Sequence, residues 1–326
     1  MKKILITTVP FGIENPLPLE LLSNAGIEYL INPLNKKLSE NELADMISDF
    51  DVIIAGTEKI TAKVMEKAKK LKMISRVGIG LDSVDLLEAR MRGISVSYTP
   101  DAPAPAVADL TMGLMYSLLR KVHESNIQMH QGKWHRYFGR RLTDCSIGII
   151  GTGRVGSKVI RNLQSLGCKK ILYYDNKVRL NSDEAIFTEK NEIYKRADII
   201  SLHLPLDAET NNMITIKEMQ LMKQDAILIN TARGGIINEK DLNTALHHKL
   251  IGGASIDVFE NEPYNGELIQ HDNCILSAHM GSMTFDCRAQ MEIEATEEAI
   301  RFLSKEVLKG KVPEDEYEVQ RKGFVE

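Results

Sequence analysis

The sequence predicts an α/β protein with two doubly wound domains, each built on a parallel sheet. Short apolar runs alternate with helical patterns along most of the 326 residues, which is typical of parallel strands joined by crossover helices. Three prolines within residues 99–106 interrupt this alternation, as a domain boundary would. A glycine-rich turn then joins an apolar run to a helical pattern at residues 147–166.

The first part of the chain supplies five apolar runs that we interpret as strands, at residues 3–9, 27–31, 52–55, 73–77 and 95–98. Helical patterns lie between them at residues 19–24, 39–47 and 61–71. The last helix is rich in lysine, but its apolar residues recur at helical spacing. We therefore interpret the lysines as a solvated helix face, with a basic binding patch as the alternative.

The proline-rich segment 99–106 is expected to be a stiff extended crossing rather than a helix, because proline lacks an N–H and fixes its backbone. Residues 107–119 are nearly all apolar on a helical pattern. They predict a helix that is buried on most sides, in part by another subunit.

The same alternation continues to the end of the chain. Further helices are expected at residues 154–166, 189–195, 217–222, 240–248 and 284–307, and further strands at residues 171–174, 198–204, 226–230, 253–259 and 273–278. The charged segment after Lys309 is expected to be peripheral or mobile.

The glycine-rich turn has the form G-x-G-x-x-G, with Gly151, Gly153 and Gly156 directly after the apolar run 147–150. Such a turn lets a pyrophosphate approach the free N–H groups at the start of a helix. The next apolar run ends at Asp175, where a carboxylate can accept hydrogen bonds from both ribose hydroxyls. Because that carboxylate would repel a 2′-phosphate, the pattern favours NAD over NADP.

Composition argues against several classes of partner. A formal net charge of -4 gives no reason to expect a nucleic acid or an anionic membrane. No apolar run approaches the length of a membrane span, and the first residues read as a strand rather than a signal peptide. The cysteines lack C-x-x-C spacing, so we expect reduced thiols in a cytoplasmic protein and no metal site. The adjacent His247 and His248 point apart on a helix and do not suggest a metal site either.

Three residues that can perform chemistry follow predicted strands: Arg233, Glu262 and His279. In open α/β sheets the ligand lies beyond the carboxyl ends of the strands, so these side chains should share a crevice. An arginine can grip a carboxylate with two parallel hydrogen bonds. A histidine beside a carboxylate is suited to donate a proton at neutral pH. With a nicotinamide, the set suits reduction of a keto acid.

These motifs resemble those of the NAD-dependent D-isomer-specific 2-hydroxyacid dehydrogenases, which include phosphoglycerate dehydrogenase, glyoxylate and hydroxypyruvate reductases and D-lactate dehydrogenase. The resemblance runs from about residue 52 to about residue 288. It is closest in pattern to phosphoglycerate dehydrogenase and to the hydroxypyruvate and glyoxylate reductases. The ordered motifs are residues 76–85, 151–156, 202–205, 230–234, 257–263 and 279–282.

The resemblance implies a Rossmann-type NAD domain at residues 100–286, inserted into a flavodoxin-like substrate domain made of residues 1–99 and 287–326. Dimers of the family bury the region corresponding to residues 107–137, which implies a homodimer. The implied reaction is hydride transfer that interconverts a D-2-hydroxyacid and its 2-oxoacid.

Roles for individual residues are also implied by the resemblance. Arg233 would bind the substrate carboxylate and polarise the keto oxygen, His279 would be the general acid or base, and Glu262 would pair with His279. Around the cofactor, Asp257 would contact the nicotinamide amide, with Gly281 close by. The other implied cofactor contacts are Thr231 and Ala232 at the nicotinamide ribose, Arg154 and Val155 at the pyrophosphate, Asp175 at the adenosine ribose and Leu204 at the adenine. In the other domain, Arg76 and the N–H groups of Val77 and Gly78 would bind the substrate.

Alternatives remain open at this point. Phosphoglycerate dehydrogenases commonly place an arginine after the strand corresponding to residues 52–54, where this chain has Ala55 and Gly56. Arg76 and Arg136 match other basic positions of that subfamily, so 3-phosphoglycerate stays a candidate substrate. The related corepressors use the fold as an NAD(H)-dependent binding scaffold, and their arginine, glutamate and histidine are also intact. Formate dehydrogenase has glutamine in place of Glu262, which argues against that enzyme.

Overall fold

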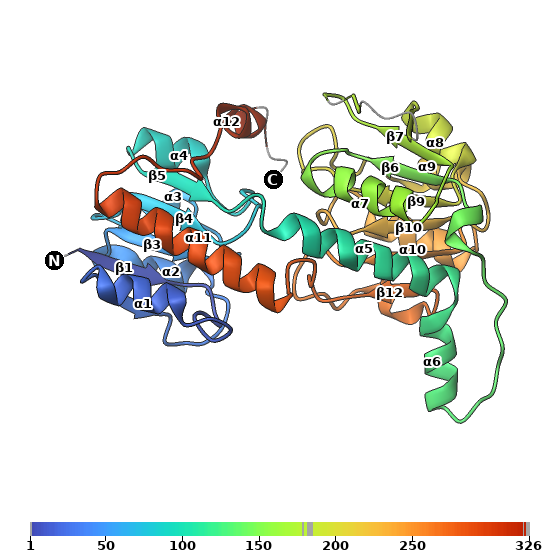
Figure 1. Cartoon of the computed structure of the whole chain (residues 1–326), viewed down its shortest axis with the longest axis horizontal. Coiled ribbons are helices and arrows are strands. Elements are labelled where there is room, and N and C mark those ends of the chain that lie inside the picture. The colour runs from blue at the N-terminus through green and yellow to red at the C-terminus, as the bar shows by residue number, and fades with distance from the viewer. Residues whose placement is uncertain (1, 178, 181–184, 322, 324–326) are drawn as a thin grey trace. The chain divides into compact units, whose positions relative to one another are not determined.

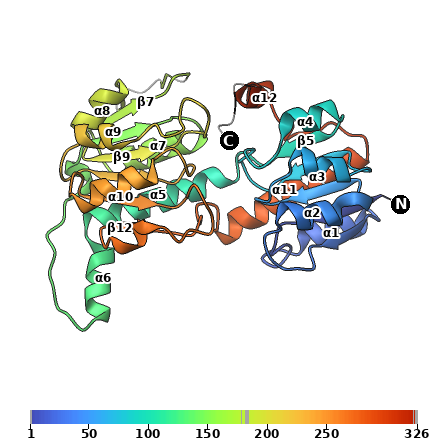
Figure 2. The same cartoon turned by 180° about the vertical axis from the view of Figure 1, so that it is seen from behind.

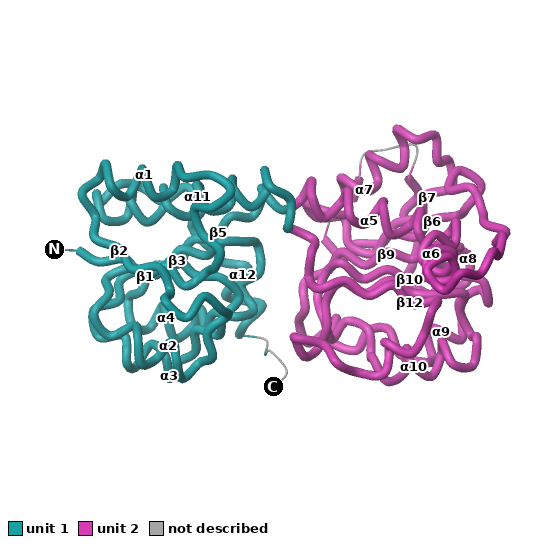
Figure 3. Tube along the Cα trace, turned by 90° about the horizontal axis from the view of Figure 1, so that it is seen from below, with its two compact units in different colours: residues 1–103, 283–324, 326 teal, residues 104–282, 325 magenta. Residues whose placement is uncertain are grey.

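The structure is a computed structural model that describes residues 2–177, 179–180, 185–321 and 323. The chain forms two compact units (Figure 3). Unit 1 combines residues up to Pro103 with those from Met283 onwards, and unit 2 comprises Ala104–Ser282. The expected boundaries followed residues 99 and 286. The expected last range, 287–326, includes residues 322 and 324–326, which lie outside the described residues.

Unit 1 contains, among its described residues, a five-stranded parallel sheet in the order β2-β1-β3-β4-β5. The strands are β1 (Lys3–Ile6), β2 (Glu28–Ile31), β3 (Val52–Ala55), β4 (Met73–Arg76) and β5 (Ser95–Tyr98). The three inner strands are almost wholly buried, which explains why they read as continuous apolar runs. The order is that of flavodoxin-like sheets, so the predicted fold class is confirmed for this unit.

Helices cover both faces of this sheet (Figure 3). The helices α1 (Leu17–Asn24) and α11 (Phe285–Leu303) pack together on one face. The opposite face is covered by α2 (Glu40–Met46), α3 (Ala62–Lys67) and α4 (Leu86–Met91). The late helix α11 therefore completes the layer that the early helix α1 begins.

The segment after Lys309 differs from the expectation of a peripheral or mobile tail. It forms α12 (Glu314–Arg321), and Tyr317 is buried. The guanidinium of Arg90 lies 3.5 Å from the centre of the Tyr317 ring. Gln320 Nε2 donates to Val84 O at 2.7 Å. The tail is held by partners more than two hundred residues earlier in the chain, which local sequence patterns do not reveal.

Unit 2 contains, in its described part, a seven-stranded parallel sheet in the order β12-β11-β10-β9-β6-β7-β8. The strands are β6 (Ile147–Ile150), β7 (Ile171–Tyr174), β8 (Ala185–Phe187), β9 (Ile199–Leu202), β10 (Ile227–Asn230), β11 (Gly253–Ile256) and β12 (Cys274–Leu276). Counted from β6, this is the Rossmann order with one strand added, as predicted. The sequence reading missed β8, which has only three residues and is therefore too short to show a clear pattern.

The strands of unit 2 divide their side chains between two cores. On one face, Ile199 and Ile227 join the cluster under α5 (Pro103–Leu119) and α7 (Arg154–Ser165). On the other, Ile200 and Leu228 join the cluster under the remaining helices. These are α8 (Lys190–Arg196), α9 (Ile216–Leu221) and α10 (Glu239–His247), which Figure 2 shows from behind. The alternation follows directly from the two-residue period of a strand.

The expected extended crossing at residues 99–106 is wrong in part, because α5 begins at Pro103. Pro103 and Pro105 occupy the first turn, whose N–H groups have no partner within a helix, so proline costs little there. A further helix, α6 (Val122–His130), was not predicted and extends away from the sheet of unit 2 with the segment that follows it (Figure 1). We call residues 122–139 the arm.

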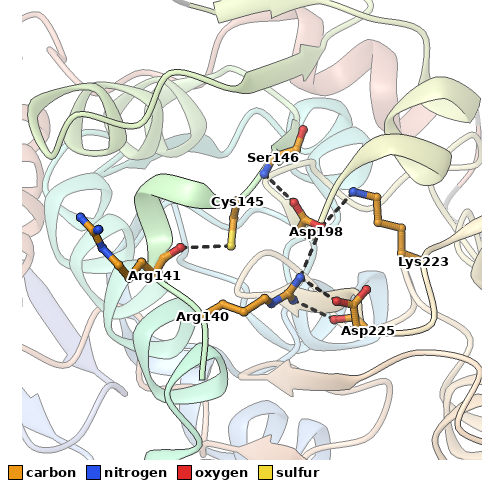
Figure 4. A network of polar contacts seen from close by, with 7 residues as sticks. All are labelled: Arg140, Arg141, Cys145, Ser146, Asp198, Lys223 and Asp225. Carbon is orange, nitrogen blue, oxygen red and sulfur yellow. Dashed lines mark hydrogen bonds and ion pairs between the residues drawn. The ribbon is translucent and has the colours of Figure 1, made fainter. Parts of the chain in front are cut away.

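A polar network attaches the end of the arm to the sheet (Figure 4). Arg140 Nη1 donates to Asp225 Oδ2 at 2.9 Å and contacts Asp198 Oδ1 at 3.3 Å. Asp198 also accepts from Lys223 Nζ at 2.9 Å and from Ser146 N at 2.6 Å. Burial acts to raise the pKa of Asp198, but the hydrogen bonds from Lys223 and Ser146 together lower it. The network joins the amino ends of β6, β9 and β10 to the residue that follows the arm.

Candidate active site

The glycine-rich turn after β6 owes its shape to close backbone contacts. Gly151 has φ +93°, and a Cβ on it would lie 2.3 Å from His203 O. A Cβ on Gly156 would lie 1.9 Å from Gly151 O, so helix α7 can approach the strand only without a side chain there. A Cβ on Gly153 would meet nothing within 4 Å. Gly153 thus leaves open the space in which a ligand could approach the backbone.

The start of α7 is open to a ligand. Gly153 is its N-cap and makes no side-chain capping bond. Arg154 is exposed and Val155 is half-buried. The N–H groups of a first helical turn have no partner within the helix, and they lie at the positive end of the helix dipole. This turn can therefore hold a phosphate group.

Asp175 lies at the end of β7, the next strand along the sheet. Its Oδ2 accepts from Thr152 N at 2.7 Å, and its Oδ1 accepts from Lys177 N at 2.8 Å. These bonds fix the carboxylate beside the glycine-rich turn, where a ribose would lie next to a bound pyrophosphate. Leu204 follows β9, and its side chain lies 3.0 Å from a Cβ built on Gly151.

His203 separates β9 from Leu204 and is half-buried. Its Nε2 lies 2.9 Å from Ser201 Oγ. Burial lowers the pKa of His203 to about 3, so its imidazole is neutral at physiological pH. His203 supports the glycine-rich turn, because Gly151 of that turn lies close to the backbone oxygen of His203.

Arg233 lies in a turn that Asn230 shapes from inside. Asn230 is buried at the end of β10, and its Oδ1 accepts from Ala232 N at 3.0 Å while its Nδ2 donates to Arg233 O at 2.8 Å. Arg233 Nη1 donates to Ala232 O at 2.7 Å. A Cβ on Gly234 would lie 2.0 Å from Phe259 O, so this turn packs directly on the segment that leads to Glu262.

Glu262 and His279 form a pair in unit 2. Both carboxylate oxygens of Glu262 lie 3.0 Å from His279 Nδ1. Glu262 Oε1 also accepts from Phe259 N at 3.2 Å, which anchors the carboxylate. The His279 side chain is 41% exposed and the Glu262 side chain 29% exposed, so a small molecule can reach the histidine.

Asp257 holds the segment that carries His279. Its side chain is fully buried at the end of β11. Its Oδ1 accepts from Ser277 Oγ at 2.6 Å and Met280 N at 2.8 Å, and its Oδ2 accepts from Gly281 N at 2.9 Å. Asp257 therefore positions the His279 segment. Its contact with the nicotinamide amide stays a prediction.

Thr231 and Ala232 begin the arginine turn. Thr231 is buried, and its Oγ1 lies 2.9 Å from Thr111 Oγ1 on α5. Ala232 is half-buried. This bond attaches the turn to the long helix that covers the sheet.

In unit 1, the predicted substrate contacts are more enclosed than expected. Arg76 is 5% exposed, and its Nη1 donates to Val77 O and, at 3.4 Å, to Ala55 O. Val77 N donates to Ala55 O at 2.9 Å, and Gly78 N donates to Thr99 Oγ1 at 2.7 Å. Arg76 thus supports the turn at residues 77–78 from within, and its contact with a substrate stays a prediction. The other basic position, Arg136, is exposed on the arm of unit 2.

Sequence reasoning gave no role to Asn230 or Glu58, although each is buried and polar. Asn230 could have been suspected, because a polar side chain at the end of an apolar run usually bonds to nearby backbone. Glu58 lies outside every strand and gave no comparable signal. In the described ranges, no three His, Cys, Asp or Glu residues are grouped so as to hold a metal ion, and no helix there has the length and apolar character needed to cross a membrane.

Comparison with known proteins places the chain among its relatives. Residues 112–281 match the model of the D-isomer specific 2-hydroxyacid dehydrogenase, NAD binding domain. A D-3-phosphoglycerate dehydrogenase of Methanocaldococcus jannaschii is 38% identical over 287 residues, which cover 85% of this chain and 53% of that protein. A glyoxylate reductase of Thermofilum pendens is 38% identical over 288 residues, 84% of this chain and 83% of that protein.

A solved structure agrees with these matches. The TT0316 protein from Thermus thermophilus superposes with a TM-score of 0.87 at 30% identity, covering 95% of this chain and 100% of that one. The chain spans about half the length of the D-3-phosphoglycerate dehydrogenase, but most of the glyoxylate reductase. It therefore belongs to the D-isomer-specific 2-hydroxyacid dehydrogenase family of NAD-dependent oxidoreductases.

Proposed function

We propose that the chain interconverts a D-2-hydroxyacid and its 2-oxoacid by hydride transfer with NAD, with His279 as the general acid and base. The observation that carries this proposal is the 3.0 Å contact between His279 Nδ1 and both oxygens of Glu262. A carboxylate on Nδ1 fixes the orientation of the ring and favours the tautomer that carries a hydrogen on Nδ1. The other ring nitrogen, Nε2, is then the one that exchanges a proton with the substrate oxygen.

Arg233 supplies the positive charge that binds the substrate carboxylate. Its guanidinium can hold the substrate carboxylate with two parallel hydrogen bonds and polarise the neighbouring keto oxygen. In the reductive direction, C2 receives the hydride that NADH supplies, and His279 gives its proton to the oxygen. The turn at residues 77–78 would add backbone contacts to the carboxylate. Gly78 N, which donates to Thr99 Oγ1 in this structure, would then donate to a carboxylate oxygen of the substrate.

We assign NAD to unit 2 and the substrate contacts of residues 77–78 to unit 1. The pyrophosphate would lie on the N–H groups of Arg154 and Val155, and Asp175 would hold the adenosine ribose. Leu204 would lie on the adenine side, and Thr231, Ala232 and Gly281 near the nicotinamide. The open space at Gly153, where a Cβ would meet nothing within 4 Å, supports the pyrophosphate position.

The first test follows the absorbance of NADH with glyoxylate, hydroxypyruvate, its 3-phosphate and pyruvate. Oxidation with at least one of them is expected. The variants His279→Ala and Arg233→Ala should each lower kcat/KM by roughly two to four orders of magnitude, because each removes a group that acts in the transition state. NADH binding, followed by fluorescence titration, should stay close to wild type. Unchanged turnover in either variant would contradict that residue's assignment.

We further propose a homodimer whose interface includes the arm. Trp134 is 80% exposed and Phe138 101% exposed, and Val122 and Met129 are also exposed. Large apolar side chains grouped on one projecting segment are typical of a surface that another chain covers. A second copy of this chain is the partner that we infer.

We also propose that the protein works in the cytoplasm. The support is that its four cysteines are all buried free thiols. Burial raises the pKa of Cys274 to about 12 and that of Cys287 to about 11, so both thiols are protonated at neutral pH. Unpaired structural cysteines are typical of reducing compartments.

A further inference from the structure

The sheet of unit 1 has a well-defined ligand edge. All its strands are parallel, and β1 lies between β2 and β3, so the chain reverses its winding direction at β1 and β3. In open α/β sheets, ligands bind beyond the carboxyl ends of the strands at such a reversal. Here β1 is followed by Thr7 and Thr8, and β3 is followed by Gly56, Thr57 and Glu58.

The carboxylate of Glu58 lies at this point. Glu58 is 2% exposed, and its Oε1 accepts from Gly56 N at 2.9 Å and from Thr7 Oγ1. A Cβ on Gly56 would lie 2.9 Å from Glu58 Oε2 and 3.1 Å from the Thr8 side chain. The carboxylate therefore occupies the space between the ends of β1 and β3, and Gly56 leaves that space to it.

Two arginines lie at the same edge, and each is matched by a buried carboxylate. The charge of Arg76 acts on Glu58. Arg288 on α11 contacts Glu292 Oε1 at 2.6 Å through its Nε, and Glu292 is also buried. Arg288 Nη2 is engaged as well, with Thr8 Oγ1 at 2.8 Å and Pro10 O at 2.7 Å. The charge of Lys37 also acts on Glu58. Because Lys37 is exposed, solvent screens this charge.

We propose that Glu58 determines substrate specificity by excluding a second anionic group, so that the substrates are 2-oxoacids with an uncharged side chain and not phosphorylated ones. This rests on the proposed function, in which unit 1 contacts the substrate. A phosphate placed at this edge would face a buried carboxylate, while the charges of both arginines are already compensated. Burial raises the pKa of Glu58, whereas the hydrogen bond from the backbone of Gly56 and the charge of Arg76 act in the opposite direction and favour the ionised carboxylate.

A matched pair of substrates tests this without any substitution. Hydroxypyruvate and its 3-phosphate share one carbon skeleton and differ only in the phosphate. With wild-type protein and NADH, kcat/KM for hydroxypyruvate is expected to exceed that for the phosphate by about tenfold or more. A preference for the phosphate would overturn the proposal. Failure to oxidise NADH with these two and with glyoxylate would instead count against the proposed function.

The variant Glu58→Gln tests the residue itself, because glutamine keeps the size of the side chain and removes its charge. The preference for hydroxypyruvate over its phosphate should shrink by about tenfold, mainly through a lower KM for the phosphate. Glu66→Gln is the matched control, since it removes an exposed charge from α3 in the same unit, and it should leave the preference unchanged. An unchanged preference in Glu58→Gln, with normal NADH binding and normal turnover of hydroxypyruvate, would overturn the assignment. If that variant does not fold, the wild-type comparison still decides.

Discussion

His279 adopts a backbone conformation that few side chains favour. Its φ is +52°, in the left-handed region, and its N–H donates to Asp257 O at 2.8 Å. Left-handed residues other than glycine persist where the surroundings hold them, and they are frequent at active sites. Here the surroundings are the backbone and the carboxylate of Asp257, which bind the segment on both sides of the histidine.

At this scale, Asp257→Asn should lower kcat by about 10- to 100-fold, because an amide NH₂ would face at least one of the backbone N–H groups that the carboxylate now accepts from, and the histidine would move. The effect should fall on kcat more than on the affinity for NADH, and steady-state kinetics with NADH titration measures both. The control Ser277→Ala removes only one of the donors and should have a smaller effect. A kcat equal to wild type in Asp257→Asn would contradict the positioning role.

A second prediction concerns the glycine-rich turn. Gly156→Ala should destabilise the protein by about 1–3 kcal/mol and weaken NADH binding, since its Cβ would lie 1.9 Å from Gly151 O. Urea unfolding and NADH titration measure the two effects. Gly113→Ala in α5 is the control, because its Cβ would meet nothing within 4 Å, and it should stabilise the helix by about 0.5–1 kcal/mol. Equal stability of the two variants would refute the packing argument.

At the scale of elements, the amino ends of β6, β9 and β10 are joined through Asp198. Burial opposes its charged form, but Lys223 and Ser146 favour that form more, so the pKa of Asp198 lies below its ordinary value of 3.8. A group whose pKa is lowered on folding contributes stability above its unfolded pKa, and this contribution is lost as the pH falls through the folded pKa.

Asp198→Asn should therefore be less stable than wild type at pH 7, and the difference between the two should shrink as the pH falls below about 4. Urea unfolding of both proteins at several pH values measures the difference. Asp225→Asn is the control, because Asp225 is more exposed and bonds to Arg140 alone in the network, and exposed pairs contribute about 0–1 kcal/mol. A difference that grows on acidification would contradict the assignment.

At the scale of the whole molecule, the arm exposes two large aromatic side chains, Trp134 and Phe138. The arm is attached at its end, where Arg140 N donates to Leu119 O at 3.0 Å and the Arg140 side chain joins the Asp198 network. An attached segment that presents such side chains is suited to contact a second copy.

Trp134→Ser combined with Phe138→Ser should shift the protein from dimer to monomer in sedimentation experiments, because apolar side chains buried at an interface contribute most of its affinity. The fold of each subunit should survive, as judged by circular dichroism. The exposed pair Ile186 and Met91, changed to serine, gives a control outside the arm. A wild-type protein that is monomeric at micromolar concentration would refute the homodimer.

The order of strands and helices, the glycine-rich turn and the residues at the strand ends could be predicted from the sequence alone. Buried strands are continuous apolar runs, and a G-x-G-x-x-G turn needs its glycines at fixed positions within six residues, so both patterns are local. Only the tertiary structure decided that Glu58 is buried where the charge of Arg76 acts on it, how Asp257 holds the His279 segment, and that α12 packs against α4. In the last two cases the partners are more than twenty residues apart. Such contacts depend on how helices and strands pack, and a periodic pattern within one segment of the sequence does not predict them.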